Sequence, residues 1–389
     1  FKLKGVIEIL LIGFYQPIRE LNDILAHYQK ELKIPVRYLQ EFTSLGTAGG
    51  INQFRDQINM DSPDLIFVMN SDICGALPLA EMLEFHASLN PSTPKFVILG
   101  TEATRSQANS FGCIVECAES HEVTHYVEKP ETFVSATINC GVYLFTPSIF
   151  NFIRIAYLSH QNTKDCELAP GSCRESINME KEVFPQLAGT GHLFVYQTDR
   201  FWSQIKSSSA VIYANRHILA MYEDNHPERL QPRTFSSQMA TSNGHKEGPV
   251  IIGHVYIHPT AKISPSAVIG PNVSIAEGAS IAEGVRLRDC IVLRSAEIRA
   301  HACCLNTVIG WESVIGEWSR IEGTPNDPNP NKPFSKLDVK PVFNEKGQLN
   351  PSITVIGYQV VVPSEVVVFN SIVLPHKELS SCVCNQIIL

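Results

Sequence analysis

Apolar and polar positions follow two different rhythms along this chain of 389 residues. Over residues 1–225, short apolar runs typical of β-strands alternate with longer amphipathic segments typical of helices. Strands alternating with helices predict an α/β domain with a Rossmann-like, doubly wound and mostly parallel sheet. The predicted strands cover 6–12, 36–40, 64–70, 95–100, 111–116, 123–128, 139–145 and 192–198, and the predicted helices 17–32 and 78–89.

After residue 250 the apolar positions repeat every six residues. A sustained period of six is typical of a left-handed parallel β-helix of hexapeptide repeats, whose inward side chains stack from coil to coil. The register slips at Glu297 and Arg299. One apolar series comprises Ile257, Ile263, Ile269, Ile275, Ile281, Leu287 and Leu293, a second Ala261, Ala267, Val273, Ala279, Val285 and Ile291, and after the slip the pattern returns with Leu305, Ile309, Trp311 and Ile315.

Segments without periodicity divide the chain. Residues 226–249 predict a linker between the α/β domain at 1–225 and the repeat domain at 250–389. Residues 159–177 are polar and predict a surface insertion. The Pro- and Asn-rich segment 323–351 interrupts the repeats, and a loop of this length is either disordered or functional.

Composition narrows the classes of function. A net charge of −8 disfavours nucleic acid as a partner, since phosphate-binding surfaces need clustered Lys and Arg. No apolar run reaches the roughly 18 residues that span a membrane. Eleven cysteines without a C-x-x-C pair predict free thiols in a reducing cytoplasm. Because a strand follows Phe1 so closely, we expect a preceding amino-terminal segment to be missing.

One acid ends the predicted strand in "VMNSDIC", residues 68–74. Asp72 therefore stands at the carboxyl end of a strand, where ligands bind in open α/β sheets. Magnesium in phosphate chemistry takes one or two carboxylates together with phosphate oxygens and water. We therefore expect a second side chain, elsewhere in the chain, to bind the same magnesium ion as Asp72.

Four further motifs stand out, and the first three each allow two interpretations. "LGTAGG" at 45–50 is either a phosphate- or base-binding turn or a plain helix start. Gly112, within a predicted strand, marks either a bulge or the close approach of a ligand. Glu128 and Lys129 of "VEKP" form either a surface ion pair or contacts to a sugar and its phosphate. Asn139 precedes a glycine within another strand.

The order "LGTAGG … NSD … FGCIVE … VEKP … NCGVYLF", followed by hexapeptide repeats, resembles the sugar-1-phosphate nucleotidyltransferases. It is most similar to the mannose-1-phosphate guanylyltransferases, over essentially the whole chain, including the tail motifs "SIVLPHKEL" and "NQIIL". The resemblance places the guanine near Leu45, Gly46, Thr47, Gly49 and Gly50. It implies that Asp72 binds magnesium and that Gly112 and Glu128 contact the sugar. It also implies that Lys129 contacts the sugar phosphate, and that Asn139, beside Gly141, contacts a sugar hydroxyl.

Two departures from the family pattern bear on activity. Catalytic members begin with a Gly-rich loop carrying an Arg and a Lys-Pro, which we attribute to the missing segment. They also carry a "FWMDIG"-like motif whose Asp is the second magnesium ligand, whereas this chain has "FWSQIK" at 201–206. Gln204 replaces that acid with a neutral amide, and Lys206 adds a positive charge. Magnesium should therefore be weakly held, with no catalytic residue expected, unless this segment is merely a variable turn.

This second departure resembles the regulatory alpha members of the family. It implies a non-catalytic sensor of GDP-mannose that needs no cofactor, forms homo- and hetero-oligomers and restrains a catalytic beta subunit. Three alternatives stay open. An active guanylyltransferase with weakened metal binding is one. A scaffold subunit of a translation-initiation exchange factor is another, which the intact "VEKP" and "NCG" disfavour. A hexapeptide acyltransferase would need His258 or His301 as a catalytic base.

Overall fold

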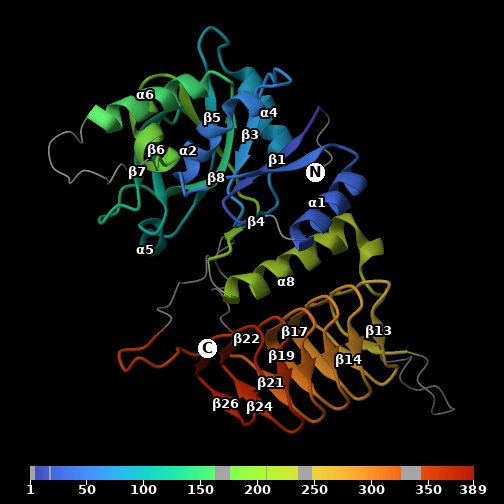
Figure 1. The fold of residues 1–389 in the computed structure, drawn as a ribbon. Helices are drawn as coiled ribbons and strands as arrows, with labels where there is room; N and C mark the ends of the chain where they lie inside the picture. The colour runs from blue at the N-terminus through green and yellow to red at the C-terminus, as the bar shows by residue number, and fades with distance from the viewer. Residues whose placement is uncertain (1–4, 17–18, 163–175, 207, 235–247, 326–342) are drawn as a thin grey trace. The chain divides into compact units, whose positions relative to one another are not determined.

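The computed structural model describes residues 5–16, 19–162, 176–206, 208–234, 248–325 and 343–389 (Figure 1). These residues belong to two compact units, Phe1–Trp202 and Ser203–Leu389. Large parts of three predicted segments lie outside the described residues, namely the insertion at 159–177, the linker at 226–249 and the loop at 323–351.

The boundary at Trp202 differs from the one that the sequence predicts at residue 225. Helix α8 (Ser208–Asn225) accounts for the difference, since it packs on the repeat coils. The Nδ2 atom of Asn215 donates to the carbonyl of Asn272 at 3.3 Å, and its Oδ1 accepts from the Ser274 hydroxyl at 2.6 Å. Apolar periodicity predicts a helix but does not record which core the helix covers.

A mixed six-stranded sheet forms the centre of the first unit. Its order is β7-β6-β8-β5-β9, with β3 also beside β8. Strand β8 is antiparallel to β3, β5 and β6, so the prediction of a mostly parallel sheet is wrong there. No helix joins β6, β7 and β8, and short connections favour antiparallel neighbours. The strands are β3 (Ile66–Met69), β5 (Phe96–Glu102), β6 (Gly112–Glu116), β7 (Val123–Glu128), β8 (Thr137–Phe145) and β9 (Leu193–Gln197).

Helices cover both faces of this sheet (Figure 1). Phe96 and Ile98 of β5 face one core, which α6 and α7 complete, whereas Val97 and Leu99 face the other, which contains Met82 of α4. Burial on both faces explains the continuous apolar runs of the central strands. The remaining elements are β1 (Ile9–Gly13), α1 (Arg19–Leu32), β2 (Val36–Gln40), α2 (Gly46–Gln53), α3 (Arg55–Ile58), β4 (Ile73–Gly75), α4 (Leu79–Ser88), α5 (Arg105–Ala108), α6 (Ile149–Asn162), the π-helix η1 (Met179–Val183), α7 (Phe184–Leu187) and β10 (Trp202–Gln204), which crosses the unit boundary.

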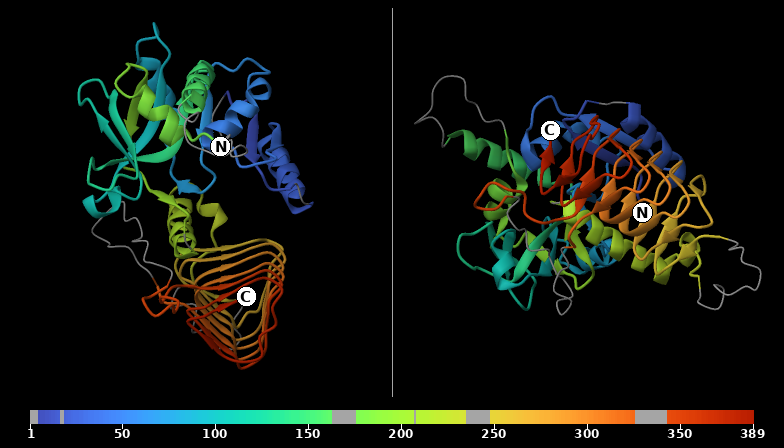
Figure 2. Two further views of the ribbon diagram at one scale, coloured as in Figure 1. Left: turned by 60° about the vertical axis from the view of Figure 1, so that its left-hand side comes forward. Right: turned by 90° about the horizontal axis from the view of Figure 1, so that it is seen from below.

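The second unit is a stack of coils built from short parallel strands, and its outline is triangular in the left view of Figure 2. Val255 lies beside Val273, and Lys262 beside Ser280, so 18 residues, or three hexapeptides, make one coil. This repeat is consistent with a β-helix. Its elements are the 3-10 helix η2 (Pro227–Arg229) and strands β11 (Val250–Ile251), β12 (Val255–Ile257), β13 (Lys262–Ile263), β14 (Val268–Ile269), β15 (Val273–Ile275), β16 (Ser280–Ile281), β17 (Arg286–Val292), β18 (Glu297–Ile298), β19 (Cys303–Ile309), β20 (Val314–Ile315), β21 (Arg320–Glu322), β22 (Thr354–Ile356), β23 (Val361–Val362), β24 (Val367–Phe369), β25 (Ile372–Val373), β26 (Val383–Cys384) and β27 (Ile387–Ile388).

The coils shorten by one residue within β17. Ser274 lies beside Ile291, 17 residues later, because the corner at Asp289 (φ 49°) uses one residue fewer. Cys290 and Val292 are therefore fully buried, and the predicted inward residues Ile291 and Leu293 are only half-buried. The slip thus precedes Glu297, where the sequence pattern first reveals it.

The later coils confirm part of the predicted pattern. Ile309 and Ile315 are fully buried in the stack, as predicted. The side chain of Trp311 is instead 49% exposed, and Leu305 is half-buried. Both predictions failed because a six-residue period carried through the slip assigns the wrong side chain to the interior.

Candidate functional site

Strands β6, β7 and β8 bring together the sugar-side residues that the sequence predicts. Gly112 of β6 lies directly opposite Glu128 of β7, while Asn139 and Gly141 are buried on β8. A methyl group on Gly112 would overlap the Tyr126 hydroxyl and lie 2.8 Å from the Glu128 carboxylate. Gly112 is therefore required by protein side chains that pack against its backbone.

Asn139 stands at the centre of a buried hydrogen-bond network. Its Oδ1 accepts from the Gly141 amide at 2.7 Å. Its Nδ2 donates to the hydroxyls of Tyr126 at 2.9 Å and Tyr143 at 3.0 Å. The Tyr126 hydroxyl in turn donates to Glu128 at 3.2 Å. The network therefore connects β8 to the predicted sugar-binding carboxylate.

A second arm of the network reaches the predicted nucleotide side. The Tyr143 hydroxyl donates to Oε1 of Glu180 at 2.9 Å, and the Thr47 hydroxyl donates to Oε2 of the same carboxylate at 2.7 Å. Thr47 also accepts from the Met179 amide at 2.8 Å. Glu180 lies on η1, and π-helical turns occur frequently at functional sites.

The Gly-rich segment 45–50 is already helical, since α2 begins at Gly46. The amides of Ala48 and Gly49 donate to the carbonyl of Ile177 at 2.9 and 3.1 Å, so the protein itself uses them. Gly46 has φ +78°, and a Cβ there would lie 2.5 Å from the Ile177 oxygen. Leu45 caps the helix, and Gly50 packs against Glu41, whose pKa is raised by burial.

The two tyrosines are held in their protonated form. Burial raises the pKa of Tyr126 and Tyr143 well above the ordinary value of 10.0, and the nearby carboxylates of Glu128 and Glu180 add to the rise. Lys129, beside them, has a 60% exposed side chain, and its Nζ lies 3.7 Å from Glu128. The site thus presents protonated hydroxyls inside and one cation towards solvent.

Asp72 lies in the turn between β3 and β4. The backbone N–H of Asn70 donates to the Gly141 carbonyl at 2.9 Å. A Cβ on Gly141 (φ +72°) would lie 2.7 Å from the side-chain Nδ2 of Asn70. Gly141 therefore lets the turn that carries Asp72 approach β8. Across the described part of the chain, no three His, Cys, Asp or Glu side chains cluster closely enough to hold a metal.

The "FWSQIK" segment spans the unit boundary. Trp202, the last residue of the first unit, is buried and its Nε1 donates to the Cys140 carbonyl at 2.9 Å. Gln204 ends β10 in the second unit, and the Lys206 amide donates to its carbonyl at 3.0 Å. Trp202 thus anchors the segment, and Gln204 and Lys206, which depart from the family pattern, follow it.

Sequence reasoning missed Tyr126, Tyr143 and Glu180. A signal existed for the tyrosines, because residues two or four apart on a strand share one face. Tyr126 precedes Glu128 by two positions, and Tyr143 follows Asn139 by four, across a glycine. Glu180 carries no local signal, since only the fold brings it to Thr47.

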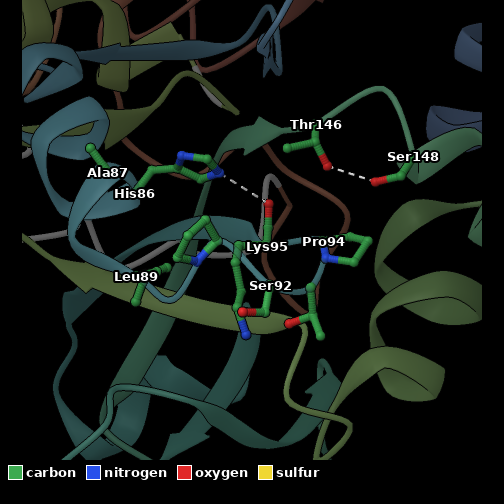
Figure 3. Close-up of a pocket in the computed structure, with 10 residues that line it drawn as sticks. His86, Ala87, Leu89, Ser92, Pro94, Lys95, Thr146 and Ser148 are labelled. Carbon is green, nitrogen blue, oxygen red and sulfur yellow. Dashed lines mark hydrogen bonds between the residues drawn. The ribbon is translucent and has the colours of Figure 1, made fainter.

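A surface pocket of about 490 Å³ lies elsewhere on the first unit (Figure 3). The end of α4, the following loop and residues 146–148 line it, and none of the predicted site residues does. His86 contacts the Lys95 carbonyl at 3.3 Å there, and burial lowers the pKa of this imidazole. Lys95 is the only charged residue among those that line the pocket, and its Nζ donates a hydrogen bond to the Gly191 carbonyl at 2.8 Å. The pocket therefore offers few groups that could bind or activate a polar ligand.

Comparison with known proteins covers the whole chain. The nucleotidyl transferase family model matches residues 2–220, and the GMPPB C-terminal domain model matches residues 251–389. The chain is 54% identical over 391 residues to the mannose-1-phosphate guanylyltransferase regulatory subunit alpha of Xenopus tropicalis, 53% over 390 to alpha-A of Danio rerio, and 51% over 390 to that of Homo sapiens. Each alignment covers 100% of this chain and 89% of the relative.

Proposed function

Because this chain belongs to the nucleotidyl transferase family, among the regulatory alpha subunits of mannose-1-phosphate guanylyltransferase, we propose that it senses GDP-mannose and restrains a catalytic beta subunit. A regulatory subunit acts through a catalytic partner. In GDP-mannose biosynthesis this arrangement would let the end product limit its own formation, with a coupling of about 1–3 kcal/mol between the two subunits' sites.

The network around Asn139 is the observation that carries this proposal. It joins Thr47, on the nucleotide side, to Glu128, on the sugar side, through a chain of hydrogen bonds whose two central bonds, from Asn139, are buried. Carboxylates accept sugar hydroxyls well, and Lys129 matches a sugar phosphate as a point charge. Both halves of a nucleotide sugar therefore have candidate partners within one unit.

The donor set does not fit a tightly held catalytic magnesium ion. Asp72 supplies one carboxylate, but Gln204 supplies only a neutral oxygen where the family pattern has an acid, and Lys206 is cationic. Magnesium that neutralises transferring phosphates depends on such carboxylates. The proposed sensing role therefore proceeds without a metal, and the chain by itself would be inactive.

Three further features belong to the proposal. The coils of the second unit would form a left-handed β-helix that supports homo- and hetero-oligomers. All nine described cysteines are free, which supports a reducing compartment such as the cytoplasm. Among the residues that the structure describes, no helix is long and apolar enough to cross a membrane.

Calorimetric titration with GDP-mannose tests the sensor. We expect saturable binding, weakened about tenfold or more by Glu128→Gln, because a hydrogen bond to a charged acceptor contributes about 1.5–3 kcal/mol. Glu345→Gln, an exposed acid of the second unit, is the matched control and should bind as the wild type does. A folded protein that gives no heat at millimolar GDP-mannose would refute the sensing role. In the assembled complex, added GDP-mannose should slow synthesis by the catalytic subunit.

A further inference from the structure

The hydrogen-bonding capacity of Asn139 is almost fully used inside the protein. A primary amide has two donor hydrogens and one carbonyl oxygen. The Gly141 amide can only donate, so Oδ1 must face it, and both Nδ2 hydrogens then point to Tyr126 and Tyr143. Asn139 itself is only 9% exposed. Little of this side chain is left for a ligand.

The orientation of Asn139 dictates that of both tyrosines. Each hydroxyl accepts a hydrogen from Asn139, so its own proton is directed to a carboxylate, Glu128 in one arm and Glu180 in the other. Tyr126 and Tyr143 are 4% and 1% exposed. Phe184 packs edge-on against both rings, with centroids 5.3 and 5.0 Å away, which restricts their movement.

The two arms end at different parts of the proposed ligand site. One ends at Glu128, beside Lys129, on the sugar side. The other continues through Glu180 to Thr47 on α2, the nucleotide side. A displaced hydroxyl in either arm would leave a carboxylate without its buried donor, so the two ends depend on one amide.

We propose that Asn139 is a positioning residue that orients Glu128 and Glu180 through Tyr126 and Tyr143, and so couples the sugar and nucleotide sides without touching the sugar. This inference rests on the proposed function for the identity of its ligand. The coupling itself is a property of the unliganded chain. It replaces the direct contact to a sugar hydroxyl that the resemblance implies for Asn139.

Binding of GDP and of GDP-mannose to two phenylalanine variants tests the two arms. Tyr126→Phe should lower the affinity for GDP-mannose about tenfold and that for GDP by a smaller factor, because its own arm ends at Glu128 and reaches the nucleotide side only through Asn139. Tyr143→Phe should weaken both ligands, because its arm reaches Thr47. Tyr196→Phe, on β9 outside the network, is the matched control and should match the wild type. If Asn139 binds the sugar directly, Tyr126→Phe keeps full GDP-mannose affinity, and that result would overturn the proposal.

A double-mutant cycle without ligand separates this inference from the proposed function. Thr47→Val and Tyr126→Phe alter opposite ends of the network and share no direct hydrogen-bond partner. Independent sites add in unfolding free energy, whereas coupled sites do not. We expect non-additivity for this pair and additivity for Thr47→Val with Tyr196→Phe. Additivity in the first pair would refute the coupling. If the wild-type chain does not bind GDP-mannose, the proposed function is refuted but the inference is not. The double-mutant cycle then still tests whether the network couples its two ends.

Discussion

At the scale of single residues, two glycines of this protein mark positions where another side chain packs closely against the backbone. Gly112, seen only as a glycine within a strand, allowed either a bulge or the close approach of a ligand. In the structure, Tyr126 and Glu128 occupy the space beside Gly112, and Asn70 that beside Gly141. A missing Cβ signals close packing, but the packing partner is decided by residues elsewhere in the chain.

The buried tyrosines make stability sensitive to alkaline pH. The folded protein holds the Tyr143 proton more tightly than the unfolded chain does, so the stabilisation is complete below pH 10 and is lost as pH rises beyond it. Tyr143→Phe removes this contribution. Above pH 10, the unfolding free energy of this variant should therefore fall less steeply than that of the wild type. The two slopes should differ by about 1.4 kcal/mol per pH unit. Urea unfolding between pH 8 and pH 11 measures both slopes, with Tyr196→Phe as control. Identical slopes for wild type and Tyr143→Phe would count against a proton held by the network.

At the scale of elements, coil length decides which side chains are buried. The first coils contain 18 residues, and the coil that begins within β17 contains 17, as the pairing of Arg286 with Cys303 shows. A period of six carried through this change puts Leu293 inside. The shortened corner at Asp289 puts Val292 there instead.

Alanine substitutions at these two neighbours test the coil register. Val292→Ala should lower the unfolding free energy by about 2 kcal/mol, because a fully buried Val is removed from the stack. Leu293→Ala removes more carbon but from a half-buried position, so its effect should be smaller. Denaturant titration followed by circular dichroism gives both values. A larger loss for Leu293→Ala would mean that the six-residue period continues unbroken.

At the scale of the whole molecule, the proposed function combines an enzyme family's fold with an incomplete set of magnesium ligands. The chain keeps Asp72 and the site on β6, β7 and β8, and has Gln204 and Lys206 at positions where the family pattern differs. Binding energy for a nucleotide sugar can persist where stabilisation of transferring phosphates is lost. Regulation by occupancy is the role that such a molecule can retain.

Metal removal should leave ligand binding intact. We expect the purified chain to synthesise no GDP-mannose from GTP and mannose-1-phosphate, and its affinity for GDP-mannose to be the same with magnesium or with EDTA. Asp72→Asn should likewise bind normally, since its charge serves no metal in this role. Assays of the catalytic partner under the same conditions provide the positive control. Robust synthesis by this chain alone, abolished by Asp72→Ala, would favour the active guanylyltransferase.

By itself, the sequence determined the elements and the family. Strand, helix and hexapeptide periods are local, because each reflects which neighbouring side chains share a face. The strands at 36–40 and 123–128 match β2 and β7 residue for residue. Motif order carried the family resemblance, which the relatives confirm.

Only the tertiary structure decided what depends on residues far apart. The direction of β8, the unit that α8 joins and the shortening at Asp289 each result from packing between elements, which no local period records. The hydrogen bond between Thr47 and Glu180 joins positions 133 residues apart. A buried polar side chain must find its partner in the folded chain, so the network around Asn139 exists only once distant segments have met.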